Sequence, residues 1–133
     1  MDIAQINLSA VLLAALAKFM VGALWYMPFL FGRAWLQDVG KKGEDLGSPL
    51  RPMMLSAALG LLTAYTLAVI IMVAGLDFIQ SLAMAGLISI GIMASMIGPQ
   101  MAYENRSFRL YAIYVGQYIV EFFVMAAIIG AWG

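Results

Sequence analysis

Four long apolar segments dominate this sequence, and they restrict the folds that the chain can adopt. They cover about residues 7–26, 53–75, 78–98 and 108–132. A helix of about 20 residues rises about 30 Å, which matches the hydrocarbon thickness of a bilayer. Hydrophobic residues make up 65% of the 133 positions, against roughly 45–50% in soluble proteins. We therefore expect an all-α polytopic membrane protein, with one domain over residues 1–133 folded as an up-down-up-down bundle of four transmembrane helices.

The links between the segments differ in length. The second and third segments meet at Gly75-Leu76-Asp77, where an Asp-x-x-Gln pattern indicates a capping box, and so short a link predicts a tight antiparallel hairpin. Pro99 is interpreted as a stop signal for the third segment. The first link, residues 28–52, is the longest, and its aromatic front half predicts a short interfacial helix on the cytoplasmic side. The opening residues lack a basic stretch, so we expect a spanning first helix rather than a cleaved signal peptide.

Apart from Lys18, the basic residues are confined to the first and third links and to the turn that adjoins the third link. They are Arg33, Lys41, Lys42, Arg51, Arg106 and Arg109. The opposite side carries only Asp2 and Asp77 outside the segments. Lys and Arg are enriched in cytoplasmic links, so we expect both termini outside the cytoplasm and the long first link inside it.

Two lone charges lie near the middle of otherwise apolar segments, Lys18 in the first and Glu121 in the fourth. At 1.5 Å per residue, Lys18 lies roughly 12 Å from the end of its helix at Tyr26, and Glu121 roughly 20 Å from Phe108. Side chains lean toward the N-terminus of their own helix, so these two lean toward each other. We predict a buried ion pair, within one chain or between two, with Gln117 as a further hydrogen-bond partner.

The fourth segment carries a polar stripe around this pair. We predict a polar intramembrane site made of Lys18, Tyr114, Gln117, Tyr118 and Glu121, in which the Tyr114 hydroxyl also bonds the pair. An ionisable residue inside a membrane indicates function by default, here a proton- or ion-linked site. The structural alternative is that Lys18 extends to a headgroup and Glu121 is protonated, or that the pair closes the bundle.

Small residues recur every fourth position in the second segment, at Ser56, Gly60, Ala64 and Ala68. Such spacing lets membrane helices approach closely. We interpret it as packing within the bundle, and the alternative is contact between copies in a homo-oligomer.

Composition also limits the chemistry. There is no cysteine and no histidine, so we expect no metal and no other cofactor. No nucleophile–base pair is visible, so we do not expect an enzyme. The net charge is zero, and we expect the lipid bilayer, further copies or membrane subunits as partners rather than nucleic acid.

One motif covers the end of the first segment and the residues that follow it. Residues 22–35 read Gly-x-x-Trp-Tyr-x-Pro-x-x-Phe-Gly-Arg-x-Trp, and a weaker similarity covers Glu104–Tyr111 and the C-terminal stretch. This pattern resembles a bacterial membrane family known as domain of unknown function 1761, over nearly the whole chain. The resemblance implies a small four-helix membrane protein and brings no assigned activity.

The motif residues have two physical interpretations. They are Trp25, Tyr26, Pro28, Gly32, Arg33 and Trp35. In the first interpretation they anchor the chain at headgroup depth. In the second, the segment packs back under the bundle and forms the mouth of a cavity. The leading functional hypothesis is an oligomeric transporter or channel for a small solute or ion, and the alternative is an accessory or scaffold subunit of a membrane complex.

Overall fold

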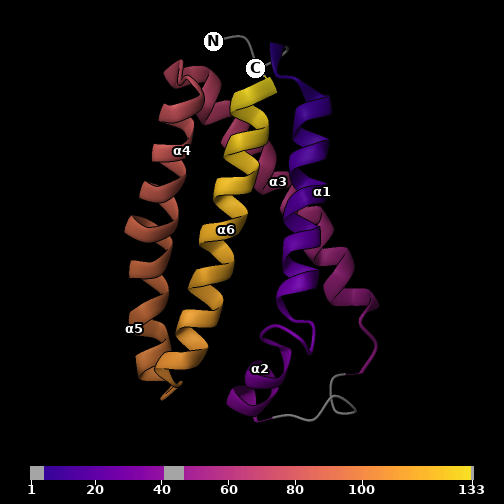
Figure 1. The fold of residues 1–133 in the computed structure, drawn as a ribbon, viewed down its shortest axis with the longest axis vertical. Coiled ribbons are helices and arrows are strands. Elements are labelled where there is room, and N and C mark those ends of the chain that lie inside the picture. Colours follow the sequence, from indigo (N-terminus) through magenta and orange to yellow (C-terminus); the bar gives the residue numbers. More distant parts are fainter. Residues whose placement is uncertain (1–4, 41–46, 133) are drawn as a thin grey trace.

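The computed structural model describes residues 5–40 and 47–132, and helices make up most of both ranges. The elements are α1 (Leu8–Trp25), α2 (Gly32–Val39), α3 (Leu50–Ala74), α4 (Phe78–Gly86), the π-helix η3 (Leu87–Ala94), α5 (Ser95–Tyr103) and α6 (Phe108–Trp132) (Figure 1). The α4–η3–α5 run is one continuous span, so four helices are long and apolar enough to cross a membrane. The expectation of an all-α, multi-pass membrane protein is confirmed.

Helix α6 is the centre of the arrangement. It packs most extensively against α1 and α4, and it also contacts η3, α2, α3 and α5, while α3 packs mainly against α1. The start of α1, the end of α6 and the turn between α3 and α4 lie at the same end, at the top of Figure 1. Side chains on α6 can therefore meet partners from every other span.

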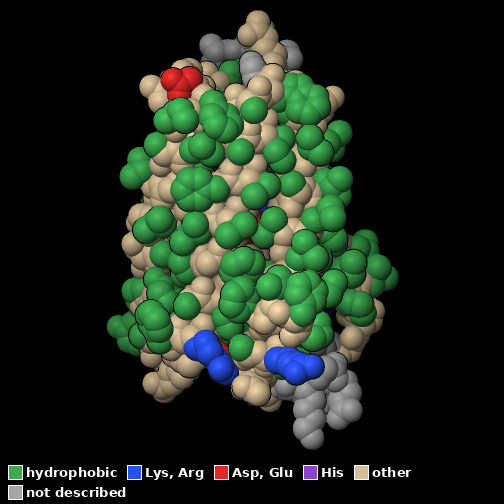
Figure 2. Space-filling view, viewed as in Figure 1, with side chains coloured by type: hydrophobic (Ala, Val, Ile, Leu, Met, Phe, Trp, Pro, Cys, Tyr) green, Lys and Arg blue, Asp and Glu red, His purple; other side chains and the backbone are tan. Residues whose placement is uncertain are grey.

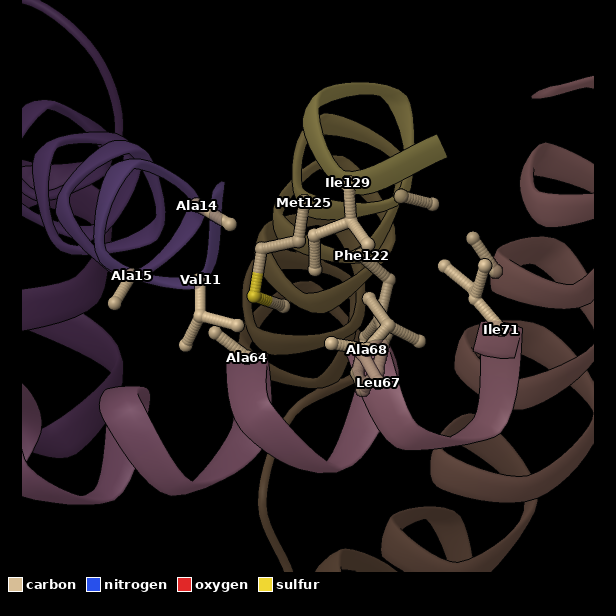
Figure 3. Close-up of a cluster of buried hydrophobic side chains, with 12 residues drawn as sticks. Val11, Ala14, Ala15, Ala64, Leu67, Ala68, Ile71, Phe122, Met125 and Ile129 are labelled. Atoms are coloured by element: carbon tan, nitrogen blue, oxygen red, sulfur yellow. The ribbon is translucent and has the colours of Figure 1, made fainter. Parts of the chain in front are cut away.

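The core between these helices is built largely from small side chains. Ala14, Ala64, Ala85 and Ala126 are fully buried, and in Figure 3 the side chain of Met125, which belongs to the same buried cluster, extends toward Val11 and Ala64. Small residues bring helix backbones close together, and close packing supplies much of the association energy in a bilayer. Larger apolar side chains cover the outer surface, as Figure 2 shows, where lipid is their natural solvent.

The small-residue face of α3 is used mostly within the chain. Gly60, Ala64 and Ala68 are buried, whereas Ser56 is exposed. A Cβ added at Gly60 would lie 3.6 Å from the Lys18 Cδ, so this face accommodates a side chain of α1. These contacts agree with the interpretation of this face as bundle packing.

The predicted end of the third apolar segment near residue 98 is wrong, because the helix continues through Pro99 to Tyr103. Proline has no backbone N–H, so one carbonyl in the preceding turn receives no hydrogen bond from it. The wider π-turns of η3 come just before it, and the Ala94 carbonyl accepts a hydrogen bond from the Tyr111 hydroxyl at 2.8 Å. A side chain from α6 thus supplies a donor where the backbone of this helix is irregular.

The turn between α3 and α4 forms as expected, but the tight hairpin does not. The capping box is confirmed, with Asp77 and Gln80 bonding each other's backbone N–H groups at 2.8 and 3.1 Å. Gly75 closes the turn with φ of 64°, a conformation that glycine adopts easily. The two helices then diverge, because α3 packs mainly on α1 while α4 packs on α6. Helix α3 also begins at Leu50, three residues before the expected start.

Candidate functional site

The structure places the two intramembrane charges against each other within one chain. The Lys18 Nζ lies 3.5 Å from the Glu121 Oε1. The Glu121 side chain is 2% exposed and the Lys18 side chain 19% exposed. Charge-assisted hydrogen bonds are about 2.7–2.9 Å long, so this ion pair is close but loosely held.

A short hydrogen-bond chain extends from the pair toward the end of α1. The Gln117 Nε2 donates to the Glu121 Oε2 at 3.1 Å. The Tyr26 hydroxyl donates in turn to the Gln117 Oε1. Within the described residues, every buried side-chain nitrogen and oxygen has a hydrogen-bond partner. The carboxylate is therefore held by an amide on one oxygen and an ammonium on the other.

A glycine in α1 makes this approach possible. A Cβ added at Gly22 would lie 3.3 Å from both the Gln117 Nε2 and the Glu121 Oε2. That separation is shorter than most real contacts of a methyl group. The backbone of α1 therefore borders the polar groups of α6 directly at this point.

Within the described residues, neither tyrosine of the predicted site makes a hydrogen bond to the ion pair. The Tyr114 hydroxyl accepts a hydrogen bond from the Trp35 Nε1 at 3.2 Å, in place of the expected bond to the pair. Tyr114 and Tyr118 line a separate open cavity of about 270 Å³. The other polar residues around this cavity are Gln100, Glu104 and Arg106. Of the five predicted site residues, the structure brings together Lys18, Gln117 and Glu121.

The motif after α1 packs back onto α6 through three aromatic donors. The Trp25 Nε1 donates to the Ile113 carbonyl at 2.9 Å, and Tyr26 and Trp35 make the bonds to α6 described above. Tyr26 and Trp35 also contact each other, with ring centroids 5.2 Å apart. Spacing in the sequence indicated an interfacial role for Tyr26, and only the fold reveals its bond to Gln117.

The remaining motif residues shape the turn itself. Pro28 lies between α1 and α2. Gly32 is buried, and a Cβ there would collide with the Tyr26 carbonyl oxygen, so no larger residue fits without a shift. Arg33 is exposed. The turn is thus folded tightly enough to return α2 beneath the bundle.

A second ion pair, which no pattern in the sequence predicted, fixes α2 to the start of α6. Arg109 donates to both carboxylate oxygens of Asp38, at 2.8 Å from its Nε and 2.7 Å from its Nη2. Its Nη2 also bonds the Gln37 Oε1 at 3.3 Å. The hydrogen bonds from Arg109 lower the pKa of Asp38 below its usual value. The two partners are 71 residues apart, and no local pattern links them.

The site offers few ligands for a metal ion. Glu121 is the single carboxylate at the ion pair, and no group of three or more His, Cys, Asp or Glu side chains gathers in the described part of the chain. Its groups are suited instead to binding protons and hydrogen-bonding solutes, because they comprise a carboxylate, an ammonium, an amide and a phenol.

The fold and the buried ion pair define a small multi-pass α-helical membrane protein. A family model described as a protein of unknown function, DUF1761, matches residues 9–130, and the chain belongs to that family. The resemblance seen in the sequence motif is confirmed by this match. Neither the curated proteins nor the solved structures gave a match.

Proposed function

We propose that this protein is a small membrane transporter in which Glu121 carries a proton, or a small solute linked to a proton, across the bilayer. The observation that supports it is the loose pair at mid-span: a carboxylate that is 2% exposed, 3.5 Å from a lysine that is 19% exposed. Charges at this depth are costly, and they usually line pathways for protons, ions or substrates. A tightly bonded pair would be better suited to holding helices together than to taking up and releasing a proton.

The residues around the pair suggest how Glu121 takes up and releases a proton. When a proton neutralises the Glu121 carboxylate, its attraction for Lys18 falls, and the ammonium turns toward the open groove beside it. That groove has a volume of about 330 Å³ and is bordered by Gly22, Tyr26 and Gln117. Above the pair, Ala14, Ala64 and Met125 are fully buried and close the other side. Access to the pair in this conformation is therefore from the side of the groove.

The charge distribution supports an orientation for this access. The helices that carry Arg33, Arg51 and Arg109 have these residues toward the lower end of Figure 1, and Figure 2 shows basic side chains at that end and an acidic patch, without basic side chains, at the opposite end. Lys41, Lys42 and Asp2 lie outside the described residues. By the positive-inside rule, we place this end in the cytoplasm of a bacterial inner membrane, with both termini on the other side.

Reconstitution into liposomes tests this proposal. An imposed pH gradient should decay faster with the wild-type protein than in empty vesicles, and Glu121→Gln should return the decay to the empty-vesicle rate. Glu104→Gln is the matched control, because Glu104 is an exposed carboxylate in a link. Wild-type flux in a folded Glu121→Gln variant would remove this carboxylate from the mechanism.

The second candidate is an accessory or scaffold subunit, in which the pair joins helices. The observation that favours it is that Lys18, Gln117 and Tyr26 together tie α1 to α6, and that no buried side-chain nitrogen or oxygen in the described residues lacks a hydrogen-bond partner. In that case the wild-type protein would show no flux although folded, and it would co-purify with a fixed membrane partner. A discrete homo-oligomer with flux would support the transporter instead.

A further inference from the structure

The groove beside the ion pair lies between the end of α1 and the start of α3. Its apolar walls are Phe19, Ala23, Pro52 and Met53. Its polar lining consists of Tyr26, Ser56 and Gln117. The volume of about 330 Å³ is within the range of about 300–1,000 Å³ typical of small-ligand pockets. Apolar walls with a few convergent polar groups are the usual composition of such a pocket.

The polar lining has unused hydrogen-bonding capacity. Gln117 uses one N–H on Glu121, and its second N–H is available. The Tyr26 oxygen donates to Gln117 and can still accept. The Ser56 hydroxyl bonds no other described side chain and is exposed to the groove. One small head group can therefore both donate and accept here.

Gly22 keeps this lining accessible. It borders the groove, and an added Cβ would come within 3.3 Å of the Gln117 amide and the Glu121 carboxylate. Because no side chain stands there, a head group in the groove can reach the amide without moving a helix. The same close fit limits the head group to a few atoms.

The charges around the groove select against an ionic ligand. Lys18 and Glu121 already neutralise each other at 3.5 Å, so an added cation or anion would leave an uncompensated charge in a medium of low dielectric constant. We infer that the groove binds a lipid-soluble molecule with a small uncharged head, a hydroxyl or a carbonyl, held by Gln117, Tyr26 and Ser56.

The ligand would enter sideways from the bilayer. The groove is formed within two spanning helices, and exposed apolar side chains such as Met20, Leu24 and Met54 lie on the surfaces next to it. An apolar tail can therefore remain among lipid chains while the head reaches the lining. This inference rests on the proposed function, because it names the solute class that the Glu121 site would carry.

Photolabelling in vesicles tests the inference. The probe is a long-chain alcohol with a diazirine in its tail, and labelled residues are mapped by mass spectrometry without any pH gradient. We expect labels concentrated on residues 19–23 and 52–56, and competition by dodecanol but not by dodecylammonium or dodecanoate at equal membrane concentration. Labels spread evenly over all lipid-facing helices, or competition by either ion, would overturn the inference.

A groove-filling variant provides the second arm. Ser56→Leu places an apolar side chain at an exposed position in the membrane, so folding should be retained, and labelling should fall about tenfold. Ala57→Leu is the matched control, one position along on the exposed surface, and should label like the wild type. Equal labelling of both variants would contradict groove binding. If the wild-type protein is labelled in the groove but shows no proton flux, that result would count against the proposed function alone.

Discussion

At the scale of single residues, the ion pair offsets the free-energy cost of placing two charges inside the membrane. Burying either charge alone in a membrane is unfavourable, and each is tolerated because the other lies 3.5 Å away. Gln117 then satisfies the second carboxylate oxygen. Helix periodicity and depth predicted this meeting, because both residues lie near mid-span and lean toward each other.

The pair should behave as a coupled unit in a double-mutant cycle. Lys18→Met or Glu121→Gln alone should each lower the free energy of unfolding by about 3–5 kcal/mol, since each leaves a buried group without its partner. The double variant should lose less than the sum of the two. Unfolding by denaturing detergent in mixed micelles measures these values, and additive losses would contradict the pairing.

Tyr26 should contribute through its hydroxyl alone. Tyr26→Phe removes the donor to the Gln117 Oε1, and we expect the free energy of unfolding to fall by about 0.5–2 kcal/mol. Tyr103→Phe is the control, because Tyr103 is 90% exposed, and it should change nothing. An equal effect of both substitutions, measured in the same micelles, would be inconsistent with the bond.

At the scale of elements, α2 is held beneath the bundle by polar contacts to α6. Trp35 bonds Tyr114, and Arg109 binds Asp38 through two hydrogen bonds. Helix α2 has eight residues and only Gly32 is buried in it, so these bonds are the main ties that position it. Its place therefore depends on the charge state of Asp38.

Acid should release α2. The pKa of Asp38 is lowered in the folded state by its hydrogen bonds to Arg109, so its stabilising contribution is complete above the unfolded pKa of about 3.9 and is lost as pH falls through the folded value. Because the chain has no cysteine, spin labels can be placed at Arg33→Cys and Tyr103→Cys. Their distance distribution should broaden as the pH falls below the unfolded pKa of about 3.9 and through the lower folded value. Asp38→Asn should broaden it at neutral pH as well, and a distribution unchanged by acid would contradict this role.

The irregular third span depends on a donor from another helix. Tyr111→Phe removes the bond to the Ala94 carbonyl, so the free energy of unfolding should fall by about 0.5–2 kcal/mol. Hydrogen exchange should increase locally in η3 and α5 and not in α3. An equal increase in hydrogen exchange across all spans would show that Tyr111 acts on the whole bundle instead.

At the scale of the whole molecule, periodicity and length predicted the spans, but not how they associate. Apolar runs define a spanning helix in any bundle, which is why the four segments were recognisable. The link at Gly75 has the right length for a hairpin, yet α3 packs mainly on α1, because small residues such as Gly60 and Ala64 fit there. Pairing of spans depends on such surface fit, which a single sequence does not display.

Some residues of the candidate site were likewise predictable from the sequence, and others were not. Lys18 and Glu121 were recognisable because a lone charge in an apolar helix stands out. Tyr26 was recognised only as a motif residue at the interface and Asp38 not at all, since an aromatic at a helix end and a carboxylate in a polar link are common in membrane proteins. Their partners, Gln117 and Arg109, lie more than 70 residues away, and only the fold brings them together.

Exchanging the two charges separates transport from assembly most directly. Lys18→Glu combined with Glu121→Lys keeps an ion pair between α1 and α6, but it moves the carboxylate away from its bond with Gln117. Proton flux and unfolding should be measured on the same reconstituted preparation. We predict a folded, stable variant whose flux is that of empty vesicles. Wild-type flux in the exchanged variant would contradict a specific role for a carboxylate at position 121.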